Sequence, residues 1–287
     1  MSCVRVGSEL LELARSARAR TIHVVGIGRD VGKTTALEAI YAAAVRAGLR
    51  VGLAAMHTKH RLWLHRETIF VTARGALPRS PGVEILRTSR LSSPAGTLLY
   101  ARAASSAFYD LVGPSTAAGV REIVDELEGG SEFVAIDGAV DRIASLAGTD
   151  GAIVVSSGAA AATTMREAVD EIAALVERLR VPLYDAGEPA IEVDGALTAA
   201  GAAAFIAARE TRQIVVRDPT QIALSGKAAV GALARLNVRC KRPLRVIAAT
   251  IASIGLERTF EPRAFASAVA AATALPTFDV YAGSRAA

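Results

Sequence analysis

The stretch from residue 21 to residue 48 constrains the fold more than any other part of the chain. An apolar segment of strand length, TIHVVG, runs into the glycine-rich loop GIGRDVGKTT, and the loop opens a helical pattern that continues to residue 48. Glycines let backbone N–H groups turn inward around an anion, and the start of a helix adds its partial positive charge. The order of strand, glycine loop, GKTT and helix predicts a phosphate-binding loop. A purely structural strand-to-helix turn is the alternative interpretation.

Several residues of this loop have an expected chemical role. Lys33 is expected to reach the β- and γ-phosphates of a nucleotide, and the Thr34 hydroxyl is expected to ligate Mg²⁺. Asp30 would orient water or substrate, or else cap the glycine turn, and Arg29 would touch phosphate in its own subunit or across a dimer. We expect catalysis to involve Lys33, Asp30 and Arg29. The residues expected to contact the nucleotide are Gly28, Arg29, Asp30, Val31, Gly32, Lys33, Thr34 and Thr35.

Along the rest of the chain, apolar segments of strand length alternate with longer helical patterns, which is typical of a wound parallel sheet. The expected strands are 21–26, 50–56, 107–112, 133–137, 152–156, 213–217, 245–250 and 277–282. The expected helices are 8–18, 33–48, 116–128, 160–180, 196–209, 225–236 and 262–273. We therefore expect an α/β fold with a mostly parallel sheet flanked by helices. One P-loop NTPase domain over 1–287 is expected, with a lead-in helix within 1–20.

The block at 57–92 departs from this pattern. Its segments RLWLH, TIFVTAR and VEILRTS alternate in hydrophobicity, which favours a small inserted β-hairpin over another βαβ unit. The block is also rich in histidine and basic residues near its start. Lys59 and Arg61 are candidate anchors for an anionic substrate, with a solvated basic hairpin as the alternative. A metal site is not expected, because His57, His60 and His65 point to different faces along a strand.

A metal partner for the glycine loop is expected at the end of another strand. Asp137 follows the apolar run FVAI and precedes a glycine. In P-loop proteins such an acid binds Mg²⁺, whereas a turn aspartate before glycine is the alternative. Asp141 and Arg142 follow at the same edge, where open parallel sheets bind their ligands. Ser115, after FYDLVGP, would offer its hydroxyl to a ligand or act at a helix start.

Composition excludes several functional classes. The net charge is +5, but the 33 basic residues are scattered along the chain and aromatic residues make up only 5%, so nucleic-acid binding is not expected. The start of the chain lacks the unbroken apolar stretch of a signal peptide, and the apolar run at 196–208 is too short for a bilayer. Two cysteines do not make a disulfide framework. A cytoplasmic protein that binds no membrane is expected.

The stretch GIGRDVGKTT resembles the loop of dethiobiotin synthetase and of the related cobyrinate-type synthases. These belong to the P-loop superfamily that also contains the MinD-like and signal-recognition GTPases. The resemblance implies ATP and Mg²⁺ as cofactors and a homodimer around the nucleotide. No NKxD guanine motif follows the segment 245–250, so adenine is the expected base. Two departures argue against dethiobiotin formation itself: Lys59 lies several positions late after the second strand, and the chain is longer, with the inserted block at 57–92.

Stretches spread over nearly the whole chain resemble a set of bacterial P-loop proteins that accompany coenzyme-B12-dependent amino-acid aminomutases. The stretches are GRDVGKTT, HTKHRLWLHRETIFVTAR, DLVGPST, IDGAVDRIAS and TFDVYAG. This resemblance implies a slow ATPase that serves a partner enzyme as an accessory or reactivating factor. Two alternatives remain open. One is an ATP-dependent small-molecule synthase or kinase, and the other is a nucleotide-binding protein that does not hydrolyse its nucleotide.

Overall fold

The computed structural model describes residues 2–56, 60–77, 82–114, 116–140, 143–148 and 150–281. Its helices are α1 Ser2–Ser16, α2 Lys33–Arg46, α3 Ala117–Gly130, α4 Met165–Leu179, α5 Ala199–Ala207, α6 Gly226–Leu233 and α7 Pro262–Thr273. Each helix expected from the sequence is present, although α1 begins at Ser2 rather than at residue 8. No helix within these ranges combines the length and the apolar character needed to cross a membrane.

The strands and 3₁₀ helices complete the order of elements. The strands are β1 Thr21–Gly26, β2 Val51–Ala55, β3 His60–Leu64, β4 Ile69–Ala73, β5 Val83–Ser93, β6 Gly96–Ala103, β7 Ala107–Leu111, β8 Phe133–Val140, β9 Ala152–Gly158, β10 Ala190–Glu192, β11 Gln213–Val216, β12 Val238–Cys240, β13 Arg245–Ala252 and β14 Thr277–Asp279. The 3₁₀ helices are η1 Arg74–Ala76, η2 Ile143–Leu146 and η3 Pro219–Gln221.

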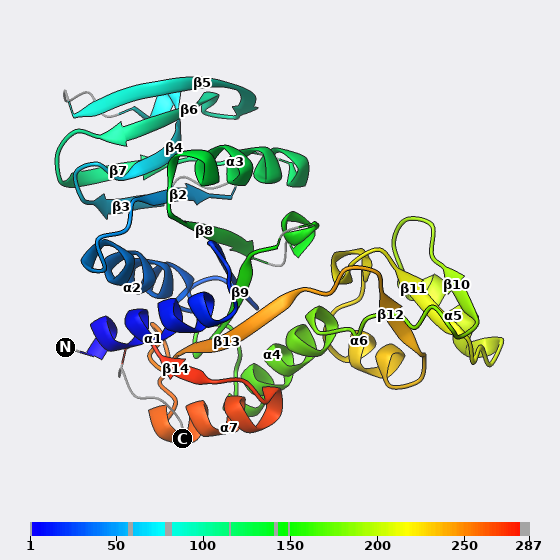
Figure 1. Ribbon diagram of the computed structural model, residues 1–287. Helices are drawn as coiled ribbons and strands as arrows, with labels where there is room; N and C mark the ends of the chain where they lie inside the picture. Colours follow the sequence, from blue (N-terminus) through cyan, green and yellow to red (C-terminus); the bar gives the residue numbers. More distant parts are fainter. Residues whose placement is uncertain are drawn as a thin grey trace.

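Nine of these strands form the main sheet, in the order β14-β13-β9-β1-β8-β2-β4-β6-β5. Neighbouring strands from β14 to β4 pair in parallel, whereas β6 pairs antiparallel with both β4 and β5. Figure 1 shows the helices distributed around this sheet. The expected α/β class, with a mostly parallel sheet flanked by helices, is confirmed.

Helices cover both faces of the sheet, and strand alternation decides which residues each face buries. Phe133 and Ala135 of β8 pack with the apolar residues of α1 and α2, whereas Val134 and Ile136 pack with those of α3. A third cluster joins α4 and α7 to β9 and β13 on the same face as α3. Successive side chains of a strand point to opposite faces, so a parallel strand buried on both sides reads as a continuous apolar run.

The hairpin expected within 57–92 is not formed by the three segments that suggested it. All three are strands, but β3 pairs with β7, β4 lies between β2 and β6, and β5 forms a hairpin with β6. The strand β6 was not expected, because Leu98–Ala101 are all buried and show no alternation. The turn of the observed hairpin ends at Gly96, whose φ of 102° is readily adopted only by glycine.

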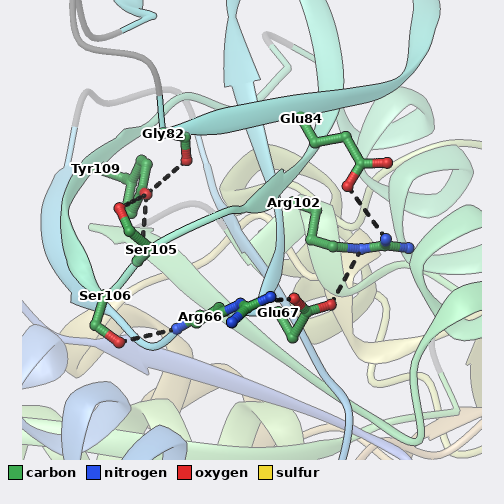
Figure 2. A network of polar contacts seen from close by, with 8 residues as sticks. All are labelled: Arg66, Glu67, Gly82, Glu84, Arg102, Ser105, Ser106 and Tyr109. Atoms are coloured by element: carbon green, nitrogen blue, oxygen red, sulfur yellow. Dashed lines mark hydrogen bonds and ion pairs between the residues drawn. The ribbon is translucent and has the colours of Figure 1, made fainter.

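A network of polar contacts ties the β3–β4 turn to the antiparallel part of the sheet (Figure 2). Arg102 of β6 forms ion pairs with Glu84 of β5 at 3.2 Å and with Glu67 of the turn at 3.9 Å. The Tyr109 hydroxyl lies 2.7 Å from the carbonyl oxygen of Gly82. Because the ion pairs are exposed, each contributes little to stability, and the buried tyrosine is the firmer tie.

A second, smaller sheet contains the parallel strands β10, β11 and β12. Its hydrophobic cluster is separate from those of the main sheet and includes Ile214, Val216 and Cys240. In Figure 1 this small sheet lies beyond α4 and α6, to the side of the main sheet. We call residues 181–242, which contain this sheet with α5 and α6, the side lobe. Its strands β10 and β12 have three residues each, too few for a periodic signal.

Burial of His23 in β1 predicts a pH-dependent stability. Burial lowers the pKa of His23 from 6.5 to about 4, so the unfolded chain binds the proton more readily than the folded chain below pH 6.5. The titration of His23 therefore costs almost no stability above pH 6.5, and the free energy of unfolding falls as the pH drops from 6.5 toward 4. We expect a loss of about 2 kcal/mol in the free energy of unfolding between pH 7 and pH 5.

Urea titrations at the two pH values measure this effect. His23→Gln should remove most of the pH-dependent difference, whatever its own cost in stability. His65→Gln, which removes an exposed imidazole, is the matched control and should leave the difference unchanged. Equal pH dependence in His23→Gln and the unaltered chain would contradict the assignment.

Candidate functional site

The predicted phosphate loop lies at a point where the chain changes direction within the sheet. From β1 the chain passes through α2 to β2 on one side, whereas from β9 it continues to β13 and β14 on the other side. Open α/β sheets bind ligands in the crevice that such a change creates at the carboxyl ends of the strands. Because β1 lies between β8 and β9, the loop at 26–32 emerges at this crevice.

The backbone of the loop has the conformation that turns N–H groups inward. Asp30 and Gly32 both have left-handed backbones, with φ of 55° and 81°. Left-handed residues between right-handed ones form concave nests of N–H groups that attract anions. Gly32 is the N-cap of α2 and, as a glycine, offers no side chain as a cap. The first turn of α2 therefore starts directly at the loop, where helix N–H groups are not bonded within the helix.

Neighbouring strand ends form a tight wall behind the loop. A Cβ on Gly32 would lie 2.9 Å from Cγ2 of Val280 and 3.1 Å from Cβ of Ala252. A Cβ on Gly158 would lie 2.9 Å from Cα of Val31. The loop is thus seated against the ends of β9, β13 and β14. The sequence pointed to Gly158, which belongs to a polar loop after a strand. It did not point to Ala252 or Val280, because these look like ordinary core residues.

Lys33 carries its charge over the loop. The residue is 8% exposed, and its Nζ donates a hydrogen bond to the carbonyl oxygen of Gly28. The aliphatic stem passes so close to Gly26 that a Cβ there would lie 3.0 Å from Cδ of Lys33. Glycine at position 26 therefore makes room for the lysine stem. The ammonium group is held where an anion in the loop would meet it.

Asp137 lies on the sheet face that α2 covers. It is 2% exposed and is in register with Val24 of β1 and Ala55 of β2. Since Phe133 and Ala135 of the same strand face α2, the alternation places Asp137 on that face too. The sequence suggested that the strand ends at Asp137, but β8 continues to Val140, because it stays paired with β1 up to Gly26.

Thr34 and Asp137 fit a magnesium ion better than a transition metal. Thr34 is in the first turn of α2, which packs against β8, so its hydroxyl and the Asp137 carboxylate belong to the same region. Mg²⁺ prefers oxygen ligands and is held by one or two protein groups together with phosphate oxygens and water. Within the described ranges, no group of three or more His, Cys, Asp or Glu residues is arranged to hold a metal.

The remaining loop candidates differ in exposure. Arg29 and Asp30 are exposed, Val31 is buried beneath Gly158, and Thr35 is half-buried in the first turn of α2. Val31 therefore contributes packing and a backbone N–H rather than a side-chain contact. The exposed Arg29 is available to a ligand or to another molecule.

Most of the substrate candidates fall outside the described residues. These are Lys59, Ser115, Asp141 and Arg142. Arg61 is described and exposed, and its guanidinium carbon lies 5.7 Å from the ring centroid of Phe108. Its strand β3 follows the carboxyl end of β2, and Gly113 after β7 packs so closely on Ala55 that a Cβ would overlap its carbonyl oxygen. The start of β3 and the end of β7 therefore lie at the carboxyl-end edge of the sheet, where the glycine loop also emerges.

Comparison with known proteins adds no assignment. No family model, no curated protein and no solved structure matches this chain. The resemblance of the glycine loop to P-loop proteins therefore stays a prediction from its residues.

Proposed function

We propose that this chain is a P-loop protein that binds Mg-ATP between β1 and α2. The observation that carries the proposal is the position of Lys33, almost buried and hydrogen-bonded across the glycine loop at the start of α2. A helix start, left-handed loop residues and a lysine ammonium group together suit the β- and γ-phosphates of a nucleotide.

Thr34 and Asp137 are the residues that would hold Mg²⁺. When bound, this ion neutralises charge that develops on the phosphate oxygens. Lys33 would share that charge, and the loop N–H groups would fix the orientation of the phosphates. Phosphoryl transfer depends mainly on such positioning, so slow hydrolysis needs no strong general base. Asp30, exposed at the loop, is the residue proposed to orient water.

The proposed role is that of a slow ATPase serving as an accessory or reactivating factor for a metabolic enzyme, in line with the resemblance to the proteins that accompany B12-dependent aminomutases. The exposed Arg29 would then face a partner enzyme or the second subunit of a homodimer. We also propose a cytoplasmic location and no binding of nucleic acid.

One observation favours a second candidate, an ATP-dependent small-molecule synthase or kinase. A cavity of about 480 Å³ is lined by Ile27, a residue of the phosphate loop itself. A synthase needs a second pocket beside the transferred phosphate, and this volume is in the range of small-molecule sites.

Asp137→Asn tests the proposal. We expect calorimetry to show saturable Mg-ATP binding to the unaltered chain, weaker Mg-GTP binding, and slow phosphate release. Asp137→Asn, which keeps the shape of the side chain but removes its charge, should raise the Mg²⁺ concentration needed for half-maximal binding by about tenfold or more. Nucleotide binding without phosphate release would point to the non-hydrolysing alternative.

Asp150→Asn is the matched control, because Asp150 is exposed and precedes β9 at the opposite end of the sheet. It should leave the Mg²⁺ dependence unchanged. Circular dichroism and a thermal melt verify that both variants are folded. An unchanged Mg²⁺ dependence in folded Asp137→Asn would remove this residue from the metal site.

A further inference from the structure

A cleft separates the phosphate loop from the side lobe. It has a volume of about 480 Å³ and is lined by Ile27, by four residues of α4, and by the segment 223–226 that leads into α6. Its walls therefore come from three parts of the chain that are distant in sequence. Cavities of this size bury small organic molecules in other proteins.

The cleft is lined by both apolar and charged side chains. Ile27, Leu175 and Leu224 supply apolar surface. Arg178 also lines the cleft, and its Nη1 donates a hydrogen bond to the carbonyl oxygen of Leu224. Glu171 lies seven residues earlier on α4, about 10 Å away along the helix axis. This polarity suits a molecule with an apolar body, an anionic group toward Arg178 and a hydrogen-bond donor toward Glu171.

Contacts around the cleft connect it to the nucleotide loop. The backbone N–H of Ile27 donates to the carbonyl oxygen of Ser156 at 3.1 Å, so Ile27 extends the ladder between β1 and β9. A molecule in the cleft would thus touch the loop directly through Ile27.

We propose that this cleft binds a small amphipathic organic anion, and that its occupancy changes the affinity of the loop for nucleotide. The coupling rests on the proposed function, because it requires Mg-ATP at the loop, whereas binding in the cleft does not. The contact with Ile27 is the physical link, since moving this side chain moves the backbone between Gly26 and Gly28. Such coupling is reciprocal, so nucleotide must change the affinity of the cleft by the same factor.

The probe for the test is 8-anilinonaphthalene-1-sulfonate, which has an aromatic body and one sulfonate and fluoresces when it enters an apolar site. We expect one saturable site on the folded chain. Ala174→Phe, which fills the cleft, should weaken the binding by about tenfold or more, and Arg178→Gln by about fivefold. Ala173→Phe is the control, because Ala173 is the adjacent residue of α4 and lines a different cavity. It should change the affinity by less than about twofold.

Saturating Mg-ATP should shift the dissociation constant of the probe by at least about threefold in the unaltered chain. Circular dichroism identifies variants that fail to fold, and Arg178→Gln decides the outcome if Ala174→Phe is one of them. Equal probe binding in a folded cleft variant and the unaltered chain would overturn the site. Probe binding that Mg-ATP does not affect would overturn the coupling if calorimetry shows bound nucleotide. If calorimetry shows none, the proposed function fails while the cleft site stands.

Discussion

Lys33→Ala is expected to abolish measurable Mg-ATP binding. The substitution removes the ammonium group that lies over the loop and the stem that covers Gly26. Hydrogen bonds to charged groups contribute about 1.5–3 kcal/mol each, and the lysine is expected to bond two phosphates. The dissociation constant should therefore rise by about a hundredfold or more, as measured by calorimetric titration.

Lys241→Ala is the matched control, because it removes the same charge from an exposed site in the side lobe, where Lys241 pairs with Glu192. It should leave nucleotide affinity unchanged within about twofold, since distant surface charges are screened by salt. Folded Lys33→Ala that keeps its affinity within a few-fold of the unaltered chain would mean that the glycine loop is structural. The proposed function would then be wrong, whatever the cleft binds.

Gly32→Ala should cost both stability and nucleotide affinity. A left-handed backbone costs an L-residue about 1–2 kcal/mol, and at Gly32 the added Cβ would also press on Val280 and Ala252. Crowding of this kind costs a further 1–3 kcal/mol, roughly. We expect a loss of about 3 kcal/mol in the free energy of unfolding, measured by urea titration. Mg-ATP binding should weaken as well, because relief of the contact moves the start of α2.

Gly48→Ala separates the two contributions. Gly48 has a similar φ of 74°, but a Cβ there would meet nothing within 4 Å. The substitution should therefore cost only the backbone strain, about 1–2 kcal/mol, and leave nucleotide binding intact. If the two alanine variants lose the same stability and bind Mg-ATP equally well, the wall behind the loop has no functional effect.

The sequence alone was sufficient for the features that depend on neighbouring residues. The strand, the glycine loop and the helix at 21–48 were expected within two residues of their observed ends, because hydrophobic period and glycine content belong to a short stretch of chain. The seven α-helices of the described residues followed from the same periodicity. The α/β class followed from the alternation of the two kinds of segment.

The pairing of the strands could not be predicted from the sequence. The expected hairpin within 57–92 was wrong because pairing depends on contacts between distant segments, and the unexpected β6 supplies the partner for both β4 and β5. In the side lobe β11 was expected, whereas β10 and β12 were missed because three residues are too few to show a hydrophobic period. Whether the chain is one folding domain stays a prediction.

The candidate site divides in the same way. The residues of the glycine loop are contiguous, so their identity and expected roles could be predicted without the structure. Only the tertiary structure placed Asp137 on the face of α2, seated Gly32 against Ala252 and Val280, and brought Ile27 to the cleft beside the side lobe. Backbone preferences depend on residues that are close in sequence, so they can be recognised without the structure. A wall or a cleft forms only where strand ends that are distant in sequence come together.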